Sequence, residues 1–255
     1  MKLSANLGFL WADRPLPDAI RAAHAAGFDA VECHWPYDTP ASAVSAALEE
    51  TGLPMLGLNT RKGPPGENGL SALPGRSAEA RAAIDEAIAY ADATGARAIH
   101  VMAGFAEGPE AHAAFADALR YATESTDRTI LIEPLNRHDA PGYFLQTTDQ
   151  AANLIAELDL PTLKLMFDCY HVGRTEGDVV TRLAALLPLI GHIQFASVPD
   201  RGPPDRGELH YPAIFAAIQA AGWSAPLGAD YIPSGDTDAT LAGMAVATTN
   251  GGAAP

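Results

Sequence analysis

The sequence predicts an α/β protein built as a single (β/α)8 TIM barrel, and three observations support this fold class. Short apolar runs alternate with Ala-rich amphipathic stretches, in units of roughly 30 residues, along most of the chain. A length of 255 residues is ordinary for one such barrel. The Gly-rich phosphate loop that follows the first strand of many doubly wound sheets is missing, which disfavours that alternative.

The first half of the chain contains four strand–helix units. Three of the predicted helices end at a glycine, namely Gly27, Gly52 and Gly95, as helices commonly do. The expected strands are Leu3–Trp11, Ala30–Cys33, Pro54–Asn59 and Ala98–Met102, and the expected helices are Pro17–Ala26, Ala41–Thr51, Ser77–Thr94 and Pro109–Ser125.

The second half continues the same alternation. The expected strands are Thr129–Ile132, Leu163–Phe167, His192–Ala196 and Pro226–Ala229, and the expected helices are Thr148–Leu158, Asp178–Leu187 and Tyr211–Ala221. Two Gly/Pro-rich stretches, 61–74 and 198–208, follow strands, so we expect functional loops there. We expect one barrel domain over residues 1–244 and a flexible C-terminal tail over 245–255.

Composition limits the classes of partner. The chain has 31 acidic and 16 basic residues and a formal net charge of -15. Such a chain repels phosphate backbones and anionic lipid, so we expect no nucleic acid and no membrane partner. The N-terminus lacks the apolar core of a signal peptide, and two cysteines, Cys33 and Cys169, are expected to be free thiols. We therefore expect a cytoplasmic protein, and homo-oligomerisation is left open.

Four polar residues stand at the ends of four short apolar runs: Glu133, Asp168, Gln194 and Asp230. The C-terminal ends of parallel barrel strands meet around one mouth, where barrel enzymes carry their chemistry. Carboxylate and amide oxygens suit a hard divalent ion. We therefore expect these four residues to hold a divalent metal, Mg²⁺ or Mn²⁺, with the carboxylates also placed to move protons.

Three further residues are candidates for binding substrate. His171 follows Asp168 by three positions, and His100 lies in the fourth expected strand. Arg201, in the loop after the seventh strand, could bind a carboxylate with two hydrogen bonds. Weaker candidates for lining the site or binding a carboxylate are Asn6, Glu32, Arg61 and Lys62.

Several segments together resemble the hydroxypyruvate isomerase family, within the wider xylose-isomerase-like barrels that also include sugar epimerases. The similarity runs from about Leu3 to Met244, and the order and spacing of the segments carry it. The matching segments are Ala26–Glu32 with Trp35–Tyr37, Gly69–Arg76, Ile132–Asn136, Phe167–His171, His192–Gln194, and Gly207–Leu209 with Tyr211–Phe215.

The resemblance implies roles for particular residues. Glu133 matches the first catalytic glutamate of the family, and Asp168 and Gln194 match its metal-binding positions. His171 matches a histidine that contacts substrate, and Arg201 matches the arginine of the strand-seven loop. The second catalytic glutamate of the family lies in a Gly-x-Glu-Tyr motif, which here reads Gly228-Ala-Asp-Tyr231, so Asp230 takes its place.

This replacement keeps the charge at position 230 but shortens the side chain by one methylene, about 1.5 Å of reach. Proton transfer depends on close contact, so the acid/base role of Asp230 is the part of the pattern most altered. The strand-seven loop also differs, because Gly202-Pro203 stand where family members usually have His-Glu. We therefore expect either a substrate specificity that differs from hydroxypyruvate or a reduced activity.

The sequence favours an isomerase of the aldose–ketose type, acting on a small hydroxy-keto acid. For hydroxypyruvate the product would be tartronate semialdehyde, formed through a metal-stabilised enediolate with Glu133 and Asp230 as acid and base. Two alternatives use the same site: a sugar or keto-acid epimerase, and a non-catalytic barrel that binds sugar acids. A metal-dependent endonuclease is disfavoured by the acidic composition and by the lack of a three-metal His cluster.

Overall fold

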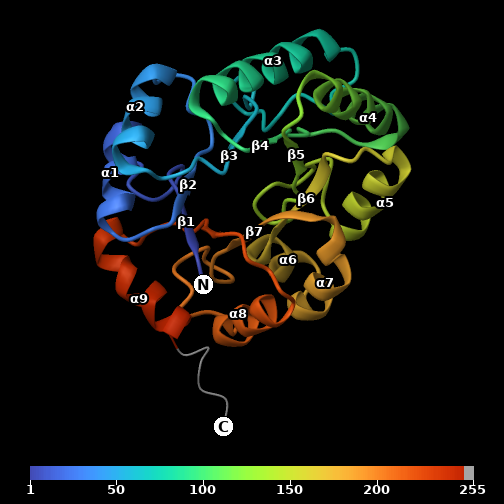
Figure 1. The fold of residues 1–255 in the computed structure, drawn as a ribbon. Coiled ribbons are helices and arrows are strands. Elements are labelled where there is room, and N and C mark those ends of the chain that lie inside the picture. Colours follow the sequence, from blue (N-terminus) through green and yellow to red (C-terminus); the bar gives the residue numbers. More distant parts are fainter. Residues whose placement is uncertain (250–255) are drawn as a thin grey trace.

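The chain folds into a barrel of parallel strands surrounded by helices (Figure 1), as the sequence predicted. The structure is a computed structural model that describes residues 1–249. Within these residues the strands pair in the order β2-β1-β8-β7-β6-β5-β4-β3. Their bounds are β1 Leu3–Asn6, β2 Ala30–Glu32, β3 Gly57–Asn59, β4 Ala98–His100, β5 Thr129–Ile132, β6 Leu163–Asp168, β7 Ile190–Phe195 and β8 Leu227–Ala229.

The barrel closes where β2 meets β3. Backbone hydrogen bonds run from the Val31 N–H to the Pro54 carbonyl (3.0 Å) and from the Leu56 N–H to the Val31 carbonyl (2.7 Å). A third bond joins the Cys33 N–H to the Gly57 carbonyl at 3.1 Å. The strand ends are therefore held in a ring, so side chains from opposite strands can meet at one mouth.

The helices form the outer ring (Figure 1), and glycines in the left-handed conformation end two of them, Gly52 after α2 and Gly95 after α3. Among the described residues, no helix is both long enough and apolar enough to cross a membrane. The helix bounds are α1 Leu16–Ala25, α2 Ala41–Thr51, α3 Ser77–Thr94, α4 Gly108–Ser125, α5 Thr148–Leu158, α6 Cys169–Thr175, α7 Val179–Leu186, α8 Tyr211–Ala220 and α9 Thr237–Thr249, with a 3-10 turn at Leu187–Leu189.

The first strand is shorter than predicted, because it ends at Asn6 rather than at Trp11. The Asn6 side chain accepts a hydrogen bond from the Gly8 N–H at 2.9 Å, and its carbonyl accepts one from the Leu10 N–H at 2.9 Å. These local bonds turn the chain away from the sheet. The apolar run from residue 7 to 11 therefore packs as a turn against the core.

Two helices were not predicted. The short helix α6 begins directly after β6, and its first turn is capped by the Asp168 side chain, which accepts from the Tyr170 N–H at 2.9 Å. Helix α9 extends to Thr249 and so includes 245–249 of the segment expected to be a tail. Residues 250–255 of that segment lie outside the described residues.

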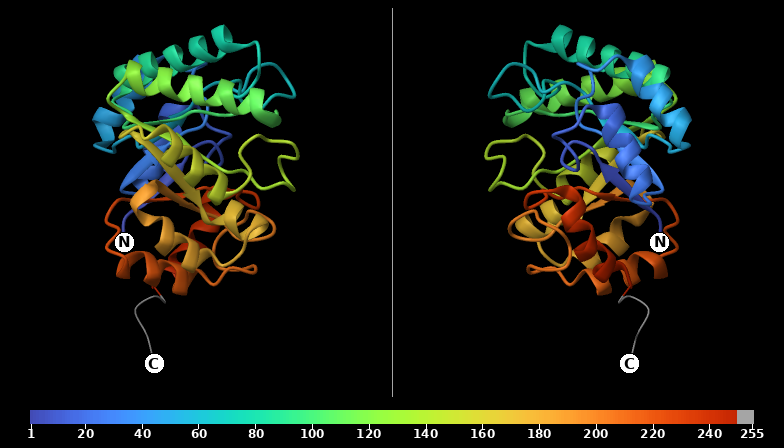
Figure 2. Two further views of the ribbon diagram at one scale, coloured as in Figure 1. Left: turned by 90° about the vertical axis from the view of Figure 1, so that its right-hand side faces the viewer. Right: turned by 90° about the vertical axis from the view of Figure 1, so that its left-hand side faces the viewer.

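The loops that follow β3, β5 and β7 project from the same end of the barrel (Figure 2). The loop after β3 is fixed to the end of β4 by a bridge between Gly69 and Ala103. Gly69 has φ +117° and Gly104 has φ +99°, and an added Cβ on Gly69 would lie 2.5 Å from the Met102 carbonyl oxygen. Only glycine permits this close approach of the two backbones.

Candidate metal and catalytic site

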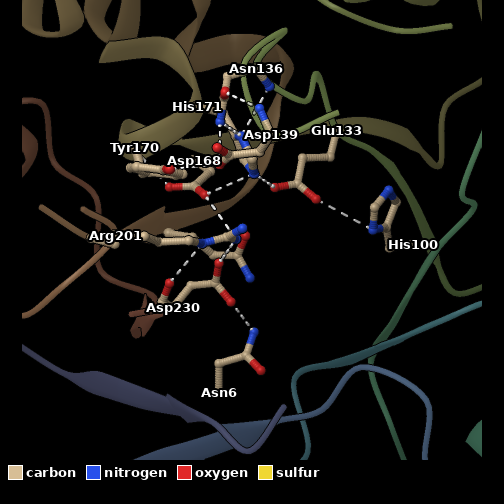
Figure 3. Close-up of polar contacts among 12 residues, drawn as sticks. Asn6, His100, Glu133, Asn136, Asp139, Asp168, Tyr170, His171, Arg201 and Asp230 are labelled. Atoms are coloured by element: carbon tan, nitrogen blue, oxygen red, sulfur yellow. Dashed lines mark hydrogen bonds and ion pairs between the residues drawn. The ribbon is translucent and has the colours of Figure 1, made fainter. Parts of the chain in front are cut away.

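Three of the four predicted strand-end residues bring carboxylates to one mouth (Figure 3). Glu133 directly follows β5, Asp168 ends β6, and Asp230 directly follows β8. All three are buried, with at most 7% of the residue exposed. Buried carboxylates need a partner or a ligand, since leaving them bare is costly.

Glu133, Asp168 and His171 form one compact group. Each offers a ligand atom, and these atoms lie within 4.8 Å of one another. One oxygen of Asp168, Oδ1, caps helix α6 through the Tyr170 N–H, while the other, Oδ2, is buried without a hydrogen-bond partner. The cap therefore fixes the carboxylate and leaves one oxygen directed at the group.

His171 enters this group as a hydrogen-bond donor. Its Nδ1 accepts from the backbone N–H of Asn136 at 3.0 Å, so the proton of the neutral ring must be on Nε2. Burial lowers the pKa of His171 well below its ordinary value, which keeps the ring neutral. Nε2 lies 3.6 Å from Asp168 Oδ2 and 3.7 Å from Glu133 Oε1. A protonated nitrogen cannot bind a cation, so in this tautomer only the carboxylate oxygens of the group are available as metal ligands.

Asp230 has three polar neighbours of its own. The Arg201 guanidinium pairs with its Oδ2, the Asn6 amide donates to its Oδ1, and His34 Nε2 lies 3.5 Å from Oδ1. Burial opposes ionisation of this carboxyl, but Arg201 and His34 outweigh it and lower the Asp230 pKa to about 2. Asp230 is thus the carboxylate of the mouth that the Arg201 guanidinium contacts most closely.

Arg201 is fixed between the walls of the mouth. Its guanidinium lies over the Phe9 ring at 4.8 Å and the Tyr170 ring at 5.0 Å, and 3.7 Å from Asp168 Oδ2. Its backbone has φ 54°, which is uncommon for a residue other than glycine. The guanidinium therefore binds the chain's own carboxylates in this structure.

Gln194 faces the barrel interior together with His192, as strand alternation predicted. Its Nε2 donates to Glu32 Oε1 at 2.6 Å, and His192 Nε2 lies 2.8 Å from Glu32 Oε2. Glu32 was expected only to line the site. It instead joins β2 to β7 across the barrel.

His100 reaches the edge of the site. Its Nδ1 lies 3.5 Å from Glu133 Oε2, and neither ring nitrogen has a hydrogen-bond partner. Burial and the neighbouring His34 lower the His100 pKa to about 3, so the ring is neutral. A neutral ring can still donate a hydrogen bond to Glu133 or to a substrate oxygen.

The buried carboxyls of the mouth differ in pKa. Burial, and then the nearby charges of Asp168 and Asp230, raise the pKa of Glu133 well above its ordinary value. Burial and Asp230 raise the pKa of Asp168 to about 7. Carboxyls with raised pKa values are poised to hold and release protons near neutral pH.

The residues present fit a divalent cation. Asp168 Oδ2 is buried and unpartnered, Glu133 is a buried carboxyl with nearby negative charge, and both lie in one group. A cation would neutralise the repulsion between these carboxylates and bind the unpartnered oxygen of Asp168.

The weaker candidates Lys62 and Arg61 have other partners. Lys62 stacks on Trp35, and Arg61 pairs with Glu86.

Sequence reasoning missed two residues that shape the mouth. His34 lies beside Asp230, and Asn136 sets the tautomer of His171. His34 lies two positions beyond Glu32, on the same face of the chain, which is a signal that strand alternation offers. Asn136 acts through its backbone N–H and through its side-chain amide, whose Nδ2 lies 2.8 Å from His171 Nδ1, a contact between segments that the sequence does not show.

A parallel barrel that carries buried carboxylates at the C-terminal ends of its strands is typical of TIM-barrel enzymes, and the carboxylates here fit a metal ion. The family description "Xylose isomerase-like TIM barrel" matches residues 20–248. The chain therefore belongs to the xylose isomerase-like TIM barrel family.

Similar proteins cover nearly the whole chain. A 2-oxo-tetronate isomerase of Cupriavidus necator is 39% identical over 94% of this chain and 96% of its own length. A hydroxypyruvate isomerase of Escherichia coli is 34% identical, over 96% of this chain and 98% of its own. A crystal structure named AP endonuclease, family 2, from Brucella melitensis has a TM-score of 0.92 at 34% identity, covering 96% and 98% of the two chains. The two isomerase relatives confirm the resemblance to hydroxypyruvate isomerases and the prediction of an isomerase.

Proposed function

We propose that this chain isomerises small 2-keto-3-hydroxy acids, interconverting hydroxypyruvate and tartronate semialdehyde or acting on the four-carbon analogue. The observation that carries the proposal is the buried Glu133 carboxyl, which has a raised pKa and lies in a group with Asp168 and His171. The names of the relatives support the same substrate class, because hydroxypyruvate and 2-oxo-tetronate both carry a carbonyl between a carboxylate and a hydroxyl-bearing carbon.

The proposed reaction moves one proton between neighbouring carbons. Glu133 takes a proton from the hydroxyl-bearing carbon, and the electron pair left behind forms an enediolate with the adjacent carbonyl. Delivery of a proton to the former carbonyl carbon and loss of one from the terminal hydroxyl complete the shift. A divalent cation held by Glu133, Asp168, Gln194 and Asp230 would supply Lewis-acid stabilisation of the negative oxygens.

The other residues of the mouth have distinct proposed roles. The Nε2–H of His171 donates to a substrate oxygen that gains negative charge, which stabilises the enediolate. Arg201, held by Asp230, binds the substrate carboxylate with the edge of its guanidinium that remains accessible. His100 orients Glu133, and Asp230 stands opposite as the second acid/base group.

An epimerase remains the main alternative. A 3-keto-D-glucoside 4-epimerase of Escherichia coli has a TM-score of 0.81 at 22% identity, which shows a shared fold alone. The Brucella relative is named an endonuclease, but two observations oppose that activity for this chain. The net charge is -15, and the described residues contain a single group of side chains that could hold a metal.

A substrate panel tests the proposal. C3 and C4 hydroxy-keto acids, with sugars as the comparison, are incubated with Mn²⁺ or Mg²⁺ and followed by proton NMR in D2O. The proposal predicts a new aldehyde from hydroxypyruvate, or a ketone moved from carbon 2 to carbon 3 of the four-carbon acid, and neither product is expected when a chelator is added. A new stereocentre without a carbonyl shift would favour the epimerase, and metal-dependent substrate binding without exchange would favour the non-catalytic barrel.

A further inference from the structure

The side-chain amide of Gln194 can be oriented in two ways. The carbonyl oxygen and the amide nitrogen are similar in size, so a half-turn exchanges them at little steric cost. Only the oxygen can bind a cation, since the nitrogen presents hydrogens. A glutamine therefore serves as a metal ligand only if another contact decides which atom faces the metal.

Glu32 provides such a contact. Its Oε1 accepts a hydrogen bond from Gln194 Nε2 at 2.6 Å and a longer one from Asn6 Nδ2 at 3.3 Å. Its Oε2 lies 2.8 Å from His192 Nε2. The carboxylate thus accepts from every neighbour. If the Gln194 amide were reversed, two oxygens would face each other at hydrogen-bond distance and repel.

Packing does not fix the amide. Gln194, Glu32 and His192 border an internal cavity of about 220 Å³ that extends along the barrel toward its N-terminal end. The lining combines small residues such as Gly57 and Gly191 with larger ones such as Leu131 and Met166, and the empty volume beside Gln194 leaves its amide room to turn. The orientation therefore depends on hydrogen bonds rather than on steric contact.

We propose that Glu32 is a positioning residue that holds Gln194 with its oxygen toward the metal and its nitrogen toward β2. This inference rests on the proposed function, in which Gln194 is a metal ligand. Glu32 touches neither metal nor substrate and acts through one hydrogen bond. Removal of such an outer contact typically weakens metal binding by about 10- to 100-fold.

The test is a Mn²⁺ titration of the full chain, with free Mn²⁺ measured by electron paramagnetic resonance. Glu32→Gln removes the charge and permits either orientation of Gln194. Glu32→Asp keeps the charge but withdraws the oxygens by about 1.5 Å. Both variants are expected to bind Mn²⁺ about tenfold or more weakly than the wild type.

Glu176→Gln is the matched control. The Glu176 side chain is as buried as that of Glu32, with 6% exposed; it accepts hydrogen bonds from Thr148 and forms an ion pair with Arg182. This control is expected to lose stability but to keep wild-type Mn²⁺ affinity. Circular dichroism and thermal melts establish that each variant is folded before it is titrated.

Two results separate this inference from the proposed function. If the wild type binds no Mn²⁺, the metal site of the proposed function is wrong, and the inference falls with it. If the wild type binds Mn²⁺ and folded Glu32→Asp binds it equally tightly, only the inference is wrong, because charge alone would then account for any loss in Glu32→Gln. Equal weakening in both variants, with Glu176→Gln unchanged, supports the positioning role.

Discussion

At the scale of single residues, the mouth is controlled by which atom carries a proton. Asn136 places the proton of His171 on Nε2, and Arg201 keeps Asp230 ionised. Glu133 and Asp168 have raised pKa values because they are buried near other negative charges. The sequence predicted that carboxylates would meet here. Their protonation, however, depends on neighbouring residues from distant segments of the chain, and the sequence alone does not show which of these residues lie close to them.

Metal binding is therefore expected to compete with protons at these carboxyls. A cation requires the ionised form, so Mn²⁺ affinity should rise with pH through about 7, by up to about tenfold per pH unit for each proton released. Calorimetry at pH 6 and pH 8, in buffers of different protonation enthalpy, counts the protons. We expect more protons to be released at pH 6 than at pH 8.

Counting released protons is the suitable readout, because the histidines and the carboxyls of the mouth change the free energy of unfolding with pH in opposite directions. His100 and His171 have lowered pKa values, so they favour the folded state more as pH rises, whereas the raised carboxyls act in the opposite direction. Asp168→Asn removes one titrating carboxyl and should reduce the proton release of any remaining binding. Affinity that does not change with pH, without proton release, would contradict this account.

At the scale of elements, the strands and helices that the sequence predicted are present in the structure wherever the spacing of apolar residues was regular. Helix α6 was missed because its seven residues are too few for a periodic pattern, and only the cap at Asp168 marks its start. Strand β1 was predicted too long because the apolar run continues after Asn6 has already turned the chain. Local side-chain hydrogen bonds, rather than hydrophobicity, set both boundaries.

The loop after β3 offers a prediction at the same scale. Gly69→Ala should destabilise the protein by about 2 kcal/mol or more, because the residue has positive φ and the new Cβ would meet the Met102 backbone. Gly66→Ala is the control, since Gly66 also has positive φ (+93°) but open space around its Cβ. Urea unfolding compares the two, and an equal loss of stability would show that the close contact is unimportant.

At the scale of the whole molecule, the barrel was predictable because the alternation of elements repeats along the chain and barrel topology puts all strand ends at one mouth. That topology also explains why Glu133, Asp168 and Asp230 could be grouped from sequence. The topology does not tell which of these carboxylates pairs with Arg201. It also does not tell that Glu32 and His192 join opposite sides of the barrel. Those contacts depend on side-chain geometry within the closed ring.

Glu133 is the proposed base of a metal-dependent isomerase, and its replacement tests that role. The most direct measurement compares the wild type with Glu133→Gln for conversion of hydroxypyruvate in D2O with Mn²⁺, followed by proton NMR. We expect the wild type to form tartronate semialdehyde with deuterium exchange at carbon, and folded Glu133→Gln to be slower by about 100-fold or more. Turnover by Glu133→Gln at the wild-type rate would contradict it.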